Sequence, residues 1–185
     1  MNEEYILYLD MDGVLVDFEG GFIKLSKGIK ATELYKQYGD KAVQHYYLSA
    51  GTDFWADLDW IEGGRELWEV SRKLFRRVNI LSSAGTTDPE KGKPVIAGKL
   101  MWLKKNMPEI PESNIFIVYG KHNKQKFATK ESILVDDVQE TIKTWNLKGG
   151  YGILHNSSNY QKTIETLEDI VKPITLKEIL KRKHI

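Results

Sequence analysis

The sequence contains no cysteine, which excludes disulfides, thiolate metal sites and a cysteine nucleophile. It also has almost no net charge, because 27 lysines and arginines stand against 26 aspartates and glutamates, for a formal charge of +1. The protein as a whole is therefore not attracted to nucleic acid or to an anionic membrane, and any charge that binds phosphate must be local.

Long apolar runs are missing as well. No stretch approaches the ~18 apolar residues that are needed to cross a bilayer. The first residues, Met1 to Glu4, have neither the basic region nor the apolar region of a signal peptide. We therefore expect a cytoplasmic protein with no membrane partner and no stable nucleic-acid partner.

Five short apolar runs predict the strands of one sheet. They cover residues 5–9, 78–81, 115–118, 132–135 and 151–154. Short, continuous apolar runs are typical of parallel strands that are buried on both faces. Helical patterns lie between them, most clearly at residues 97–106 and 138–147. Strands that alternate with helices predict an α/β fold with a doubly wound parallel sheet.

The stretch from residue 17 to about 76 interrupts this alternation. It is mostly helical in pattern and contains many aromatic residues, namely Tyr35, Tyr38, Tyr46, Tyr47, Phe54, Trp55, Trp60 and Trp68. We interpret residues 17–76 as a small helical cap inserted after the first strand, and residues 1–16 and 77–185 as the core domain. At the end of the chain, Ile174 to Ile185 has the pattern of a short amphipathic helix.

Carboxylates follow the first and the fourth predicted strands. Asp10 and Asp12 come after the first strand, and Asp136 and Asp137 end the fourth. Open parallel sheets bind ligands at the carboxyl ends of their strands. Mg²⁺ takes oxygen ligands, usually one or two carboxylates together with water and substrate phosphate. Asp10 and Asp136 are therefore predicted to share one magnesium ion.

Two serines and a lysine complete the set. Ser82 and Ser83 follow the second strand and Lys126 precedes the fourth, so these groups can hold phosphate oxygens where negative charge is stabilised during transfer. Carboxylates form aspartyl-phosphate intermediates, which makes Asp10 the predicted nucleophile. Asp12 is the predicted acid and base, which protonates the leaving oxygen and then deprotonates water. Each residue alone also fits a structural role, but together they predict a phosphohydrolase.

These residues resemble the motifs of the haloacid dehalogenase superfamily. Residues Asp10–Asp17, which read Asp-Met-Asp-Gly-Val-Leu-Val-Asp, resemble its first motif, and Ile80-Leu81-Ser82 resembles its second. Lys126 resembles the third motif, and residues 134–137 resemble the fourth.

The resemblance extends to one family within that superfamily, the 5'(3')-deoxyribonucleotidases. Residues 17–22, which read Asp-Phe-Glu-Gly-Gly-Phe, resemble the segment that follows the first motif in this family. Lys126 lies ten positions before Asp136, which is the spacing expected there. In all, the resemblance spans residues 5 to about 155.

The resemblance implies a Rossmann-like core, a small helical cap, a magnesium ion and the dephosphorylation of nucleoside monophosphates. It implies that Asp12 offers its backbone carbonyl to the metal and that Asp137 acts through a water or supports the other ligands. The Ser83 backbone would lie near the phosphate, and Phe18 would help line the nucleoside pocket. Five cap aromatics are left open between contact with the base and packing in the cap: Tyr35, Tyr38, Tyr46, Tyr47 and Trp55.

Three other functions fit parts of the pattern. A phosphorelay receiver domain has its acidic pair after the first strand and its phosphoacceptor after the third, which disagrees with the order here. A polynucleotide-end (3') phosphatase would share the core chemistry and would use the basic run Lys121–Lys126 with aromatic residues of the cap. A non-catalytic phosphate-binding module is the third. The near-neutral charge favours a small phosphorylated substrate, a (deoxy)nucleotide, and leaves the oligomeric state open, with a homodimer as one option.

Overall fold

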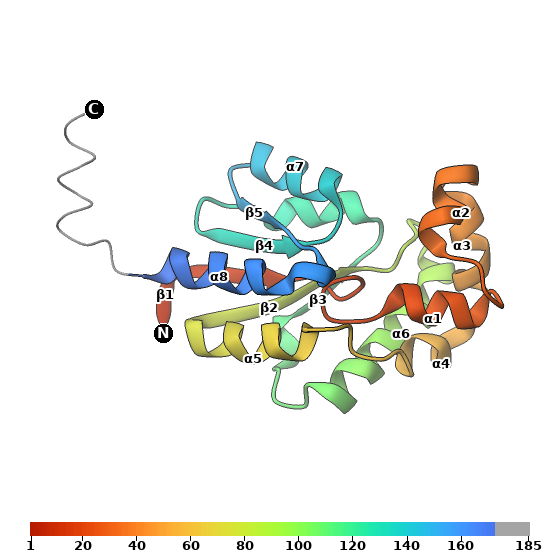
Figure 1. The fold of residues 1–185 in the computed structure, drawn as a ribbon, viewed down its shortest axis with the longest axis horizontal. Coiled ribbons are helices and arrows are strands. Elements are labelled where there is room, and N and C mark those ends of the chain that lie inside the picture. Colours follow the sequence, from red (N-terminus) through yellow and green to blue (C-terminus); the bar gives the residue numbers. More distant parts are fainter. Residues whose placement is uncertain (173–185) are drawn as a thin grey trace.

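Five parallel strands form the sheet of this protein in a computed structural model, which describes residues 1–172. The strands are β1 (Asn2–Leu9), β2 (Phe75–Ser83), β3 (Ile115–Val118), β4 (Ser132–Asp136) and β5 (Tyr151–Leu154). Their order in the sheet is β3-β2-β1-β4-β5, which confirms the predicted doubly wound α/β fold (Figure 1). The helix predicted for residues 174–185 lies outside the described residues.

The central strand β1 divides the core into two layers. Leu7 lies in register with Val78 of β2 and Ile133 of β4. Because successive side chains point to opposite faces of a strand, Leu7 and Leu9 enter one layer and Tyr8 enters the other. Both faces of the sheet are therefore buried, which explains why the strands read as continuous apolar runs.

Helices cover the two faces unequally. The larger cluster, on the Leu7 face, includes residues of α5 (Gly64–Leu74), α6 (Pro89–Asn106) and α8 (Tyr160–Val171), and it continues into the helices of the insert after β1. The Tyr8 face is covered by α7 (Gln139–Leu147) and by the 3₁₀ helix η2 (Lys121–Phe127). Two short 3₁₀ turns, η1 (Glu112–Asn114) and η3 (Ser157–Asn159), lie in loops of the core domain.

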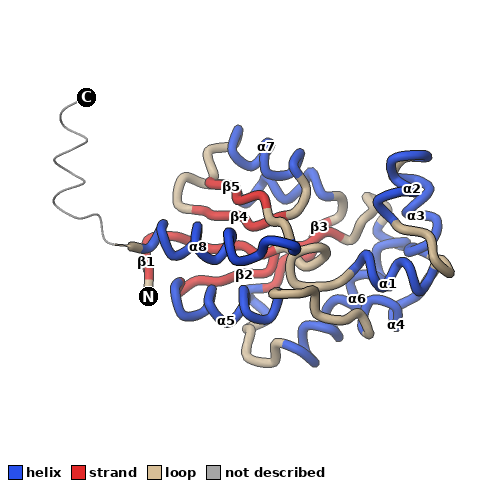
Figure 2. Tube along the Cα trace, in the orientation of Figure 1, coloured by secondary structure: helices blue, strands red, loops and turns tan. Residues whose placement is uncertain are grey.

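The insert after β1 carries the helices of the cap. They are α1 (Phe18–Leu25), α2 (Ala31–Tyr38), α3 (Asp40–Leu48) and α4 (Gly51–Ala56), and they gather at the end of the molecule opposite the N-terminus (Figure 2). The helix α5 falls within the range predicted for the cap, yet it packs against β2 and α8, which belong to the core domain. The exact domain boundary remains a prediction.

Helix α6 is longer than its sequence pattern suggested. It begins at Pro89 rather than near residue 97. The Asp88 carboxylate caps the helix by accepting a hydrogen bond from the Glu90 N–H at 3.0 Å, and Pro89 suits the first helical position because it has no backbone N–H to satisfy. Helix α7 agrees with the prediction, with Val138 as its N-cap residue. None of the described helices has the length and apolar composition to cross a bilayer.

The cap is held to the core by a close approach of α4 and α6. Gly98 of α6 lies against the backbone of α4, where a Cβ would collide with the Thr52 carbonyl oxygen and with the Cβ of Trp55. A residue without a side chain is therefore required at this crossing.

We expect Gly98→Ala to lower the free energy of unfolding by about 1–3 kcal/mol, because the added methyl group must push α4 and α6 apart. Denaturant unfolding measures this difference. Lys104→Ala, on an exposed position of the same helix, serves as the control and should change stability by less than about 0.5 kcal/mol. If Gly98→Ala is as stable as the control, the two helices are not in close contact.

Candidate active site

Asp10 and Asp136 lie side by side at the carboxyl edge of the sheet. Leu9 of β1 is in register with Val135 of β4, and the Asp10 N–H donates to the Val135 carbonyl at 3.0 Å. The residues that follow this register pair are the two aspartates, and both are buried, at 6% and 0% exposure. Two negative charges that are so little exposed to solvent require a positive charge beside them.

Lys124 supplies that charge from η2. Its Nζ lies 2.7 Å from Oδ2 of Asp10 and 2.7 Å from Oδ2 of Asp136. Burial alone would lower the pKa of Lys124, but the two carboxylates raise it above its ordinary value. The lysine therefore stays protonated and joins the two strand ends.

Asp137 adds a third carboxylate to this group. Oxygens of Asp10, Asp136 and Asp137 all lie within 4.8 Å of one another. Gly13, with φ of +74°, makes room for Asp137, because a Cβ there would collide with its carboxylate. Asp137 as a whole is exposed, but its carboxylate lies beside two buried aspartates. Loss of water around the carboxylate raises its pKa to about 8, and the charges of Asp10 and Asp136 add to the shift.

This donor set fits a divalent cation. Three carboxylates this close together repel one another, and a positive ion bound between them relieves that repulsion. All the available donors are oxygens, which are the ligands that Mg²⁺ takes. The site therefore fits the magnesium ion predicted from the sequence.

Asp12 is held by a second buried lysine. Nζ of Lys99, on α6, lies 2.5 Å from Oδ2 of Asp12, 2.9 Å from Oγ of Ser82 and 2.9 Å from the Ser83 carbonyl oxygen. Burial raises the pKa of Asp12, and the charge of Lys99 partly opposes this rise. Oδ1 of Asp12 has no hydrogen-bond partner among the residues that the structure describes. This oxygen is the atom of Asp12 on which a proton could be carried.

The two predicted serines have different surroundings. Ser82 is fully buried, and its hydroxyl accepts the hydrogen bond from Lys99. Ser83 lines the cavity, and its hydroxyl accepts a hydrogen bond from the Gly85 N–H at 3.0 Å. Of the two, Ser83 faces the space where a ligand would lie.

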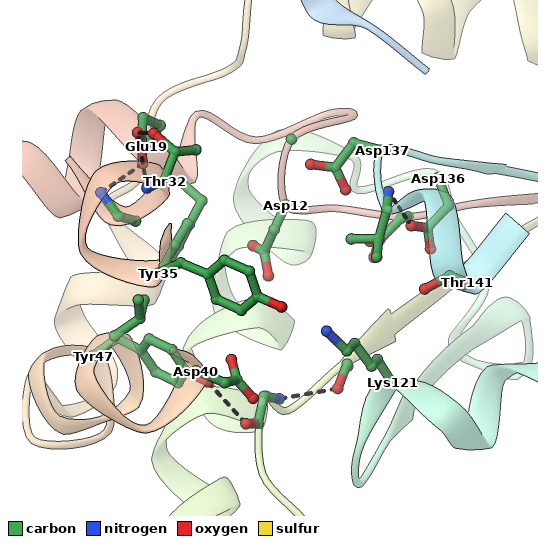
Figure 3. A pocket seen from close by; sticks show the side chains of 18 of the residues that line it. Asp12, Glu19, Thr32, Tyr35, Asp40, Tyr47, Lys121, Asp136, Asp137 and Thr141 are labelled. Atoms are coloured by element: carbon green, nitrogen blue, oxygen red, sulfur yellow. Dashed lines mark hydrogen bonds between the residues drawn. The ribbon is translucent and has the colours of Figure 1, made fainter. Parts of the chain in front are cut away.

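A cavity of about 930 Å³ separates these residues from the cap. Figure 3 shows Asp12, Asp136 and Asp137 on its core side, with Tyr35 and Tyr47 of the cap facing them. Its lining includes six of the predicted site residues: Asp10, Asp12, Phe18, Ser83, Asp136 and Asp137.

Of the five cap aromatics that were left open, three reach the cavity: Tyr35, Tyr47 and Trp55. Trp55 stacks on Phe18 with the rings 5.6 Å apart and 15° from parallel. Tyr38 and Tyr46 are not among the described residues that line the cavity; Tyr38 is exposed, and Tyr46 packs against Phe22.

The cap also binds the loop that follows β2. The Tyr47 hydroxyl donates to the Gly85 carbonyl oxygen at 2.8 Å, and the Gln44 side-chain amide donates to the same oxygen at 3.1 Å. The cap residues that line the cavity are therefore hydrogen-bonded to the loop that follows Ser83.

A family model described as 5' nucleotidase, deoxy (pyrimidine), cytosolic type C protein matches residues 4–174. The chain belongs to this family. The resemblance of its motifs to 5'(3')-deoxyribonucleotidases is thereby confirmed, and with it a nucleotidase of the haloacid dehalogenase superfamily. A search of the curated proteins finds no significant match.

Several solved structures are similar to this nucleotidase at low sequence identity. A haloacid dehalogenase superfamily hydrolase from Ehrlichia chaffeensis is 12% identical, with a TM-score of 0.56 over 93% of this chain and 100% of that one. A hydrolase from Pseudomonas syringae is 14% identical, with a TM-score of 0.48 and 90% of each chain covered. An enzyme from Bacteroides thetaiotaomicron, crystallised with magnesium and inorganic phosphate, is 16% identical, with a TM-score of 0.45 over 84% and 95% of the two chains.

The structure of the nucleotidase differs from the sequence prediction at the lysine, because Lys124 and not Lys126 reaches the carboxylates. Lys126 is exposed and is not among the described residues that line the cavity. The prediction relied on the spacing of ten positions to Asp136, whereas the 3₁₀ helix η2 places the lysine twelve positions before it. Three lysines occur within this run, and spacing alone does not decide between them.

Lys99 was missed because it lies in a helix rather than at a strand end. A signal for it does exist in the sequence. The buried positions of the second half of α6 are Val95, Gly98, Lys99, Trp102 and Leu103, which follow helical spacing. A lysine on the apolar stripe of a helix needs a buried partner, and Asp12 provides it.

We expect the affinity of the nucleotidase for Mg²⁺ to fall as the pH is lowered from about 8 to 6. Without the ion the pKa of Asp137 is raised to about 8, so below that pH a proton must leave before the carboxylate can assist binding. Calorimetric titration with Mg²⁺ in buffers of different ionisation enthalpy measures both the affinity and the protons released. An affinity that does not depend on pH, with no proton release, contradicts this expectation.

We expect Lys124→Met to reduce phosphate release by at least about 100-fold, because it removes the positive charge beside Asp10 where negative charge develops. Lys126→Met, on the exposed side of the same short helix, should keep activity within about twofold. Steady-state assays with Mg²⁺ and a deoxynucleoside monophosphate compare the two variants. If Lys126→Met is the more damaging change, the assignment from sequence spacing is restored.

Proposed function

We propose that this chain dephosphorylates (deoxy)nucleoside monophosphates, with Asp10 as the nucleophile. One observation carries the proposal: the carboxylates of Asp10 and Asp136 meet around the ammonium group of Lys124, on the floor of a cavity with aromatic walls. Family membership supports the substrate class, since the family description names a nucleotidase.

Asp10 attacks the phosphorus atom and the bond to the leaving oxygen breaks, which produces an aspartyl phosphate and the nucleoside. Its Oδ1 accepts a hydrogen bond from the Met11 N–H at 2.7 Å, and its Oδ2 pairs with Lys124. These two contacts hold the carboxylate in one orientation, so little conformational freedom is lost when substrate arrives.

Asp12 is the acid in the first step and the base in the second. It gives its proton to the leaving oxygen and afterwards takes one from the water that hydrolyses the aspartyl phosphate. The raised pKa of its buried carboxyl group suits the first task, and the nearby Lys99 charge suits the second by stabilising the ionised form.

Phosphate oxygens are held by groups from two elements. Lys124 neutralises part of the phosphate charge, and Ser83 offers its backbone and hydroxyl from the end of β2. Ser82, which was also predicted to bind phosphate, is proposed to act by holding Lys99 in position. When bound at Asp10 and Asp136, with the Asp12 carbonyl and Asp137 in support, Mg²⁺ supplies charge that offsets the repulsion between carboxylate and phosphate.

The nucleoside is proposed to lie among the aromatic residues of the cap. Phe18, Tyr35, Tyr47 and Trp55 line the cavity, and aromatic faces stack well on a base. A small ligand suits a cavity of about 930 Å³, since small-molecule sites typically measure about 300–1,000 Å³.

The location of the protein and its alternative functions are also matters of proposal. We propose a cytoplasmic location, in line with the word cytosolic in the family description. A polynucleotide-end (3') phosphatase and a non-catalytic phosphate-binding module remain the alternatives, and each makes a different prediction for the assay that follows.

We expect the wild-type protein to release phosphate from deoxynucleoside 5'- and 3'-monophosphates with Mg²⁺ and to lose this activity with a chelator. Asp10→Asn should reduce the rate by at least about 1,000-fold, because it removes the nucleophile. Faster turnover of 3'-phosphorylated oligonucleotides would favour the polynucleotide-end activity. Absence of release from every nucleotide and phosphate ester tested would favour the binding module.

A further inference from the structure

A second lysine faces the cavity close to the proposed catalytic site. Lys121 lines the same cavity as Lys124, and its amino group points into it (Figure 3). Lys124 is neutralised by Asp10 and Asp136, whereas Lys121 forms no ion pair within residues 1–172. Its charge is therefore free to attract an anionic group of a ligand.

The geometry of η2 relates the two lysines. Both belong to this 3₁₀ helix, and they are three positions apart. Side chains at positions i and i+3 of a 3₁₀ helix lie on the same face, separated by one turn of about 6 Å. Lys121 therefore presents its charge one turn away from the place where Lys124 holds the phosphate under attack.

Polar groups from two loops line the same cavity as Lys121. Gly120, with φ of +76°, is the residue before η2, and a Cβ there would lie 2.8 Å from the His122 ring and 2.9 Å from the Thr87 methyl group. The loop after β2 and the start of η2 are thus packed together, and both His122 and Thr87 line the cavity. This part of the cavity lining therefore offers an ammonium, an imidazole and a hydroxyl group, which can donate hydrogen bonds to an anion.

We propose that Lys121, with His122 and Thr87, binds a second phosphate of the substrate, and that the preferred substrates are nucleoside 3',5'-bisphosphates. The inference rests on the proposed function, because it requires the first phosphate to lie at Asp10. In a nucleoside 3',5'-bisphosphate the sugar lies between the two phosphates. One phosphate can therefore lie at Asp10 and Lys124 while the other lies near Lys121.

Two related ligands fit less well. In a nucleoside 5'-diphosphate the two phosphorus atoms share one bridging oxygen, which holds them too close together to reach groups about one 3₁₀ turn apart. An oligonucleotide would bring further phosphates towards the cap, where Asp40 lines the cavity, and the net charge of +1 gives it no general attraction.

The test compares a deoxynucleoside 5'-monophosphate, 5'-diphosphate and 3',5'-bisphosphate that carry the same base. With Mg²⁺ bound, the wild type should show a kcat/KM at least about tenfold higher for the bisphosphate than for either other substrate, as expected for an additional charged contact. Lys121→Met, which keeps the length of the side chain, should reduce this ratio about tenfold, and added salt should reduce it too. Lys126→Met should leave the ratio unchanged.

A binding measurement separates this inference from the proposed function. Asp10→Asn, titrated by calorimetry with the same ligands, should bind the bisphosphate at least about tenfold more tightly than the monophosphate, and a second change of Lys121→Met should remove the difference. Equal kcat/KM and equal affinity for the two ligands would falsify the second phosphate site, even if the monophosphate is hydrolysed. If a 3'-phosphorylated oligonucleotide is preferred to the bisphosphate, the substrate class is wrong. Tight bisphosphate binding without hydrolysis of any ligand would refute the proposed function alone.

Discussion

Two carboxylates buried at neighbouring strand ends need a positive charge between them, and the site is organised around this need. Lys124 meets it by reaching Asp10 and Asp136 at equal distances of 2.7 Å. Ionised groups without partners are very costly in a protein interior. The chain between β3 and β4 must therefore place one lysine at the edge of the sheet, which is what the 3₁₀ helix η2 does. A bound magnesium ion would add to the same balance of charge.

A second polar cluster connects this edge of the sheet to the cap. Lys99 joins Asp12 to the end of β2, and the same helix meets α4 at Gly98. From the other side, Tyr47 of the cap binds the carbonyl oxygen of Gly85. Asp12, the loop after β2 and the cap aromatics that line the cavity are thus packed together. The orientation of Asp12 therefore depends on the position of the cap relative to the core.

One short helix contributes two lysines in very different surroundings. Lys124 is buried among carboxylates, whereas Lys121 is exposed to the cavity and forms no ion pair within residues 1–172. Lys124 is placed to assist the reaction at phosphorus, and Lys121 is placed to select the substrate. Because the repeat of a 3₁₀ helix is three residues, both can face the same cavity while they bind different groups.

The sequence by itself determined the sheet, the helical insert and the acidic residues at the strand ends. Buried parallel strands must be apolar on both faces, and their carboxyl ends meet at one edge, so local patterns were sufficient for Asp10, Asp12, Asp136 and Asp137. Only the tertiary structure decided which lysines take part. Lys124 reaches Asp10 and Lys99 reaches Asp12, both from a distant part of the chain. The spacing of residues does not show which flexible lysine side chain makes such a contact. The same reason explains why the cap aromatics were left undecided, since packing between helices selects which of them face the cavity.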